Sequence, residues 1–170
     1  MEKVAVDDVD PSDLNPALRP LTDALGATDL AFNRYDLDPG GMVSGGYHTH
    51  HDQEEVFYVV SGTVTFETGE PRSGSREAVD LALGEGEAIR FAPGEFHHAY
   101  NATDDPAVVL AIGAPAYSGE VESVRECTDC GEVFNHRRPS VLGSEDGGGR
   151  IPPVECPRCG GETRRIGRPD

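Results

Sequence analysis

Hydrophobic and polar residues alternate over short stretches between residue 29 and about residue 115, and Gly, Pro and Asp separate the stretches. Alternation with a period of two is typical of half-buried β-strands, and this part of the chain nowhere sustains the 3.6-residue period of a helix. Several short strands with turn residues between them predict an all-β fold, an antiparallel sandwich or barrel. The predicted strands cover residues 29–37, 46–50, 55–61, 63–68, 77–83, 87–91, 97–101 and 107–112.

The sequence predicts three parts along the chain. Residues 1–26 are an N-terminal extension with a short helical piece: a helical turn could start at Asn15-Pro16, and one that follows Pro20 could end at Gly26. We expect this extension to pack on the sheet or on a partner subunit. Residues 27–118 form the barrel, and residues 119–170 form a separate unit that contains all four cysteines.

The chain is strongly acidic, with 31 Asp and Glu residues, 14 Lys and Arg residues and a net charge of −17. Lys3 is the single lysine. This composition resembles that of proteins from a molar-salt cytoplasm, where a Debye length of about 3 Å screens the repulsion between carboxylates. An ordinary acidic protein is the alternative. Residues 1–119 have a net charge of −15, whereas residues 120–170 have a net charge of −2, so the cysteine unit is compositionally distinct.

Charge and hydropathy also limit the partners and the location. An acidic barrel is a poor partner for a phosphate backbone, so nucleic acid is not expected there. No apolar run approaches the length of about 18 residues that a transmembrane helix needs. The acidic N-terminus lacks the pattern of a signal peptide. We therefore expect a cytoplasmic protein, in a high-salt cytoplasm, without membrane contact.

Two clusters of histidine and glutamate lie within the predicted barrel. His48 and His50 are two residues apart, so both project to one side of a strand. A turn at residues 51–53 would start a new strand and bring Glu55 back to the same side. His97 belongs to a later strand. These imidazoles and the carboxylate suit a divalent metal that keeps coordination positions open for a ligand.

The spacing of these residues resembles the two sequence motifs of the cupin superfamily over about residues 29–115. The first motif is His-x-His-x4-Glu-x6-Gly at His48, His50, Glu55 and Gly62, and the second is Gly-x7-Gly-x2-His-x3-Asn at Gly86, Gly94, His97 and Asn101. The chain departs from the usual pattern at two positions. Ala92 replaces a proline, and Met42 stands where a glycine is expected.

The resemblance implies a single antiparallel jelly-roll barrel with one metal inside it. The ligands that it implies are His48, His50, Glu55 and His97. Fe, Mn, Ni, Co, Cu and Zn all occur in such sites, so the resemblance does not choose among them. Glu54 competes with Glu55, since some cupins space this residue one position closer, but the position of Gly62 favours Glu55. His51 and His98 should point away from the metal or lie at its rim.

The four cysteines form two matching CxxCG elements at residues 127–131 and 156–160. Each CxxC turn places two thiolates on one side of a tight knuckle, and the glycine lets the backbone close beneath them. Two knuckles complete a tetrahedral S4 site, which selects Zn²⁺ as a structural centre. Iron is the main alternative metal, and two disulfides are another option. The pattern resembles zinc ribbons and rubredoxin-like knuckles, and its ligands would be Cys127, Cys130, Cys156 and Cys159.

Metal binding should fold this small unit, which cannot bury a core of its own. His136 could be an alternative ligand, but four cysteines already complete the site. Seven arginines could give the unit a basic face, for which a protein partner or docking within the chain is favoured over nucleic acid. They are Arg137, Arg138, Arg150, Arg158, Arg164, Arg165 and Arg168.

The sequence leaves the function open between different classes of protein. The leading hypothesis is a metalloprotein that binds or acts on a small organic ligand at an open site. Dioxygenase, isomerase and decarboxylase activities all occur among cupins, and no residue separates them here. The alternative is a non-catalytic ligand-sensing or regulatory module whose ribbon contacts a protein or nucleic-acid partner, and a third is a storage or structural barrel. We expect a homodimer, because such barrels often pair through sheet edges.

Overall fold

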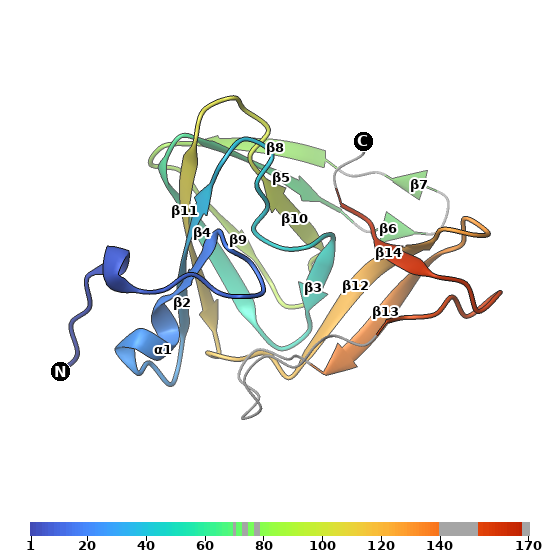
Figure 1. Cartoon of the computed structure of the whole chain (residues 1–170), viewed down its shortest axis with the longest axis horizontal. Helices are drawn as coiled ribbons and strands as arrows, with labels where there is room; N and C mark the ends of the chain where they lie inside the picture. Colours follow the sequence, from blue (N-terminus) through green and yellow to red (C-terminus); the bar gives the residue numbers. More distant parts are fainter. Residues whose placement is uncertain (70, 73–74, 77–78, 140–152, 168–170) are drawn as a thin grey trace.

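The structure is a computed structural model that describes residues 1–69, 71–72, 75–76, 79–139 and 153–167. Within these residues, the chain is mostly strand, and two antiparallel sheets enclose the core (Figure 1). The predicted all-β, antiparallel architecture is confirmed. Among the described residues, no helix has the length and apolarity needed to cross a membrane.

The first sheet has the strand order β1-β2-β11-β4-β9. Its strands are β1 Leu18–Pro20, β2 Ala31–Leu37, β11 Ala107–Ala114, β4 Glu54–Ser61 and β9 Ala88–Phe91. Strand β4 shows the predicted period of two, because Phe57 and Val59 are buried while Tyr58 and Val60 are exposed. The sheet therefore has one face toward the core and one face toward solvent.

The N-terminal extension adds to the edge of this sheet. It contains a short 3₁₀ helix, η1 Val6–Asp8, and the helix α1 Leu21–Leu25, which lies between Pro20 and Gly26 as predicted. Strand β1 pairs with β2, so the extension packs on the sheet of its own chain.

The second sheet has the order β13-β12-β3-β10-β5-β8, and β14 pairs with β12. Its strands are β13 Val133–Pro139, β12 Glu120–Cys127, β3 His48–His50, β10 His97–Tyr100, β5 Thr63–Thr68, β8 Val79–Gly84 and β14 Thr163–Arg165. A hairpin of β6 Pro71–Arg72 and β7 Ser75–Arg76 stands apart from it. The first two residues of the predicted strand 77–83 lie outside the described residues.

The second sheet runs without a break from the barrel into the cysteine unit. Strand β12 pairs with β3 on one side and with β13 on the other (Figure 1). The predicted boundary at residue 118 precedes β12, yet β12 completes the sheet that holds β3. The division into parts 1–26, 27–118 and 119–170 stays a prediction.

The core lies between the sheets and consists of buried aliphatic and aromatic side chains. Phe57 and Phe66 have ring centroids 5.2 Å apart, and each centroid lies 6.0 Å from that of Phe91. The stacked ring of His97 lies 4.2 Å from Phe91. The aromatic cluster therefore supports one of the predicted metal ligands from beneath.

Asn101, the last residue of the second motif, closes the loop between β10 and β11. Its Nδ2 donates to the carbonyls of Leu37 and Asp105, and its Oδ1 accepts from the backbone N–H and the hydroxyl of Thr103. The side chain is fully buried. Its place in the motif thus has a structural cause.

We expect Asn101→Ala to lower the free energy of unfolding by about 1–3 kcal/mol, because it leaves buried carbonyl and N–H groups without partners. Thr103→Val is the milder comparison, since it removes one hydroxyl at a half-buried position and should cost less than about 1 kcal/mol. Urea unfolding followed by circular dichroism measures both. Equal costs for the two variants would contradict this role of Asn101.

Candidate metal centre

A tight turn separates β3 from β4 and sets the direction of Glu55. Asp52 accepts hydrogen bonds from the Ser118 hydroxyl at 2.6 Å and from the Gly119 N–H at 2.8 Å. Gln53 Nε2 donates to the Pro115 carbonyl at 2.6 Å. These contacts fix the turn against the segment before β12. The turn expected at residues 51–53 is present, and β4 begins directly after it.

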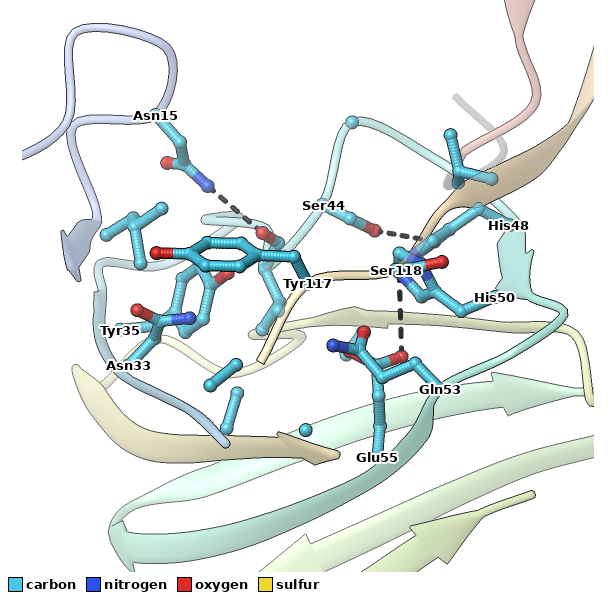
Figure 2. Close-up of a pocket in the computed structure, with 18 of the residues that line it drawn as sticks. Asn15, Asn33, Tyr35, Ser44, His48, His50, Gln53, Glu55, Tyr117 and Ser118 are labelled. Atoms are coloured by element: carbon cyan, nitrogen blue, oxygen red, sulfur yellow. Dashed lines mark hydrogen bonds and ion pairs between the residues drawn. The ribbon is translucent and has the colours of Figure 1, made fainter. Parts of the chain in front are cut away.

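The structure brings the four predicted barrel ligands together. The ligand atoms of His48, His50 and Glu55 all lie within 4.8 Å of one another. Glu55 Oε2 lies 3.8 Å from His50 Nε2 and 3.1 Å from His97 Nε2. His97 is not part of the 4.8 Å group, although its ring centroid lies 4.7 Å from that of His48. Figure 2 shows His48, His50 and Glu55 converging from β3 and β4.

Hydrogen bonds orient two of the imidazoles toward this centre. His48 Nδ1 lies 3.0 Å from the Gly46 carbonyl and 3.2 Å from the Ser44 hydroxyl, and His97 Nδ1 lies 3.3 Å from the Glu95 carbonyl. A carbonyl oxygen can only accept a hydrogen bond, so the Nδ1 that faces it is the donor and carries the proton, and Nε2 keeps its lone pair. Backbone carbonyls commonly orient metal-binding histidines in this way.

Buried polar atoms at the centre lack partners that the protein could supply. His50 Nδ1 and His97 Nε2 are buried and have no hydrogen-bond partner among the described residues. His97 Nε2 approaches Glu55 closely, but not in the direction of a hydrogen bond. Such unsatisfied atoms are rare in folded proteins. The donor set therefore fits a bound cation.

The electrostatics of the site also suit a cation. Burial opposes ionisation of Glu55, yet the contacts with His97, His50 and His48 hold its pKa at about 2. Burial, together with His97 and His50, lowers the pKa of His48 well below its ordinary value. Burial likewise lowers the pKa of His50. One carboxylate thus faces neutral imidazoles, the protonation states that bind metal.

The neighbouring candidates point elsewhere. Glu54 forms an ion pair with Arg90 on the outer side of the sheet. His51 Nε2 lies 2.6 Å from Glu122 Oε2. His98 is fully buried and stacks against Tyr100, on the other face of β10 from His97. His51 and His98 therefore lie away from the centre, as the strand pattern predicts.

A cavity of about 380 Å³ opens above the centre. Besides the four predicted ligands, its lining includes Asn33 and Tyr35 of β2, Asn15 of the extension and Tyr117 (Figure 2). Burial and the nearby Glu55 raise the pKa of Tyr35, so its phenol stays protonated. These lining residues were not predicted from the sequence. Alternation along residues 29–37 places Asn33 and Tyr35 on one face, but no motif marks that face.

The four cysteines form a second centre beyond β12. Their sulfur atoms lie within 4.8 Å of one another, and three of the Sγ–Sγ distances are 3.5, 3.5 and 3.8 Å. A disulfide requires about 2.05 Å, whereas sulfurs around a tetrahedral zinc with bonds of about 2.3 Å lie about 3.8 Å apart. All four are free thiols. The arrangement fits a metal rather than two disulfides.

Each knuckle has the backbone that the CxxCG pattern requires. Gly131 and Gly160 have φ values of 71° and 73°, in the left-handed region that glycine tolerates best. The N–H of Gly131 donates to Cys127 O, and that of Gly160 donates to Cys156 O. The two elements therefore have matching turns, which supports the predicted ribbon.

Comparisons with known proteins agree with this fold. The family model described as "Cupin domain" matches residues 33–113. A sugar phosphate isomerase of the cupin superfamily from Silicibacter pomeroyi is 21% identical with a TM-score of 0.57, over 82% of this chain and 97% of that one. A conserved protein with a double-stranded β-helix domain from Klebsiella pneumoniae is 22% identical with a TM-score of 0.54, over 70% and 94%.

A cupin protein from Bacteroides fragilis is 23% identical with a TM-score of 0.53, over 68% of this chain and 84% of that one. No curated protein sequence matches the chain. At these identities the structures support the fold alone. Together with the family model, they confirm the resemblance drawn from the two histidine motifs. Residues 33–113 therefore match a cupin domain both in sequence and in fold.

Proposed function

We propose that this protein binds one divalent metal through His48, His50, Glu55 and His97 and uses it to bind or transform a small organic molecule. One observation carries the proposal: three imidazoles and one ionised carboxylate converge at a cavity of about 380 Å³. A metal with only these ligands keeps positions open toward that cavity. Fe, Mn, Ni, Co, Cu and Zn all remain candidates.

When bound, the metal would supply Lewis-acid or redox chemistry to a coordinated ligand. The residues around the metal would contribute in different ways. Glu55 and the three histidines hold the cation, and Phe57 and Ala99 keep that end of the cavity apolar. Tyr35 offers a protonated phenol as a hydrogen-bond donor. Among the activities expected from the sequence, isomerisation is the one that also appears in the description of a structural neighbour, the Silicibacter pomeroyi protein described as a sugar phosphate isomerase.

The two adjacent glutamates provide a matched test of the barrel metal. Glu55→Ala should weaken metal binding in the barrel on the order of 100-fold, because it removes a ligand rather than a residue that supports one. Glu54→Ala should change it less than about twofold, since Glu54 contacts Arg90 on the outer face. Elemental analysis should find about two metals per chain in the wild type and the Glu54 variant, and about one in the Glu55 variant.

The cysteine site provides the internal reference, because its zinc should persist in both glutamate variants. A wild type with no metal beyond the cysteine site would refute the proposal. So would a Glu55→Ala protein that retains the full complement of metal.

A second candidate function is ligand sensing, and the pairing of β12 with β3 favours it. His48 and His50 are opposite Ser123 and Val121 of β12, the strand that ends at Cys127. A change at the metal centre would therefore reach the ribbon through backbone hydrogen bonds. Hydrogen exchange of the β13 amides with and without the barrel metal tests this function. Unchanged exchange rates would contradict the sensing function and would not affect the first proposal.

A further inference from the structure

The face of the second sheet that bears the metal ligands continues into the cysteine unit. Residues directly opposite one another on neighbouring antiparallel strands share a face. His50 lies opposite Val121, and Val121 lies opposite Arg138 of β13. Arg125 lies opposite Arg165 of β14. Since residues 121 and 125 are an even number apart on β12, Arg138 and Arg165 project to the same side as His50.

Both arginines line the cavity above the metal centre. A Cβ added to Gly45 would lie 3.1 Å from Arg165 Nη1, so the guanidinium crosses the backbone there. The next residue back, Ser44, contacts His48 Nδ1 at 3.2 Å. The two guanidinium groups thus form one wall of the cavity, and the metal ligands lie at its base.

Within the part of the chain that the structure describes, these arginines lack the carboxylate partners that other arginines have. Arg137 pairs with Glu122, and Arg164 pairs with Glu126. Four more pair in the same way, namely Arg19, Arg34, Arg90 and Arg158. Among the residues that the structure describes, no carboxylate forms an ion pair with Arg125, Arg138 or Arg165.

This absence among the described residues is unexpected, because acidic residues outnumber basic ones by 31 to 14 in the sequence. Burial, followed by the charges of Arg165 and Arg125, lowers the pKa of Arg138, and burial lowers the pKa of Arg165. The cations are therefore partly desolvated and repel one another. A charge that loses part of its hydration without gaining a partner is unfavourable, so this half-buried cluster fits an anion supplied from outside the chain.

We propose that Arg138 and Arg165 bind the anionic group of a small molecule in the cavity, so that the ligand of the metal centre is a carboxylate or a phosphate ester. The inference rests on the proposed function, because it assigns the ligand class of the same site. A guanidinium presents parallel N–H donors that match either oxyanion. On a protein with a net charge of −17, this local positive wall also offsets the repulsion that an anion meets on approach.

The assignment gives the ribbon a role in the cavity. Arg138 belongs to β13, which follows the first knuckle, and Arg165 belongs to β14, which follows the second. The cysteine site links the two knuckles. A metal there would hold both cations at the cavity wall.

The chain contains its own matched control for this inference. Arg138→Gln/Arg165→Gln removes the two inward charges, whereas Arg137→Gln/Arg164→Gln removes two charges one residue away that point outward and have carboxylate partners. Isothermal titration calorimetry at constant ionic strength uses inorganic phosphate and malonate as probes. The inward double variant should bind at least about tenfold more weakly than the wild type, and the outward one should stay within about twofold.

The outcomes separate the anion site from the metal site. Equal binding by the two double variants, or no binding of either probe by the wild type, overturns the inference. Tighter binding of phosphate indicates a phosphate ester, and tighter binding of malonate indicates a carboxylate. The titrations are repeated in the Glu55→Ala background. If the barrel holds no metal in any variant but the inward arginines still control anion binding, the anion site stands and the proposed metal function falls.

Discussion

Replacing Cys127 with serine should remove the metal from the cysteine site and release β13 and β14, while the core between the sheets stays folded. Cys127 is 1% exposed and its Sγ lies 3.5 Å from that of Cys159. Structural zinc contributes about 10–16 kcal/mol of binding free energy to zinc-finger peptides, and most of it depends on a complete ligand set. The main core cluster of the described residues contains no residue beyond Ala111, so this unit depends on its pairing with β12 and on the cysteine metal.

Two measurements test the Cys127→Ser variant. Elemental analysis should show one metal ion fewer per chain than in the wild type. The element that is lost shows whether the cysteine site holds zinc or iron. Hydrogen exchange should show loss of protection in β13 and β14, while the amides of β11 keep theirs. Arg158→Ala is the control, because Arg158 lies between Cys156 and Cys159 but is exposed and forms its ion pair with Glu132. It should keep both the metal and the protection.

A full metal complement in the Cys127→Ser variant would contradict a four-cysteine site. A different result would be equally informative. If the metal is lost but β13 and β14 stay protected, pairing with β12 alone stabilises the ribbon. In that case the arginine wall of the cavity would not depend on the cysteine metal.

Local sequence patterns were sufficient to predict the strands of the barrel. The predicted strand 63–68 is found as Thr63–Thr68, and the predicted strand 107–112 is the first part of Ala107–Ala114. Both have a period of two and follow turn residues, so each is specified by its own residues. The turn before Glu55 could be predicted for the same reason, because strand parity between positions 50 and 55 required it.

Contacts between distant segments could not be predicted in this way. The pairing of Ser123 with His48 joins residues 75 positions apart, and no local pattern marks it. Arg138 and Arg165 were therefore predicted only as members of a basic face of the ribbon. Their place in the cavity depends on the register of β12 with β3, β13 and β14. The homodimer and the high-salt cytoplasm stay predictions.

Phe57→Ala should lower the free energy of unfolding by about 3–5 kcal/mol. Phe57 is 2% exposed. Its ring centroid lies 5.2 Å from that of Phe66, 6.0 Å from that of Phe91 and 5.6 Å from that of His97. Without this ring, Phe66 and Phe91 lose a neighbour that both contact, and His97 loses one of the rings that pack against it. Tyr58→Ala is the matched control on the same strand, since Tyr58 is 41% exposed and should cost less than about 1 kcal/mol.

Urea unfolding followed by far-ultraviolet circular dichroism measures both variants, since the chain has no tryptophan to report on the core. Phe57 also lines the cavity of about 380 Å³, so the space left by its ring would join that cavity rather than form a closed void. Water could then reach the underside of His97, and the barrel metal should bind more weakly in Phe57→Ala than in Tyr58→Ala. Equal unfolding costs for the two variants would contradict this packing. A large cost in stability with unchanged metal affinity would show that His97 is held in place by its backbone rather than by the aromatic cluster.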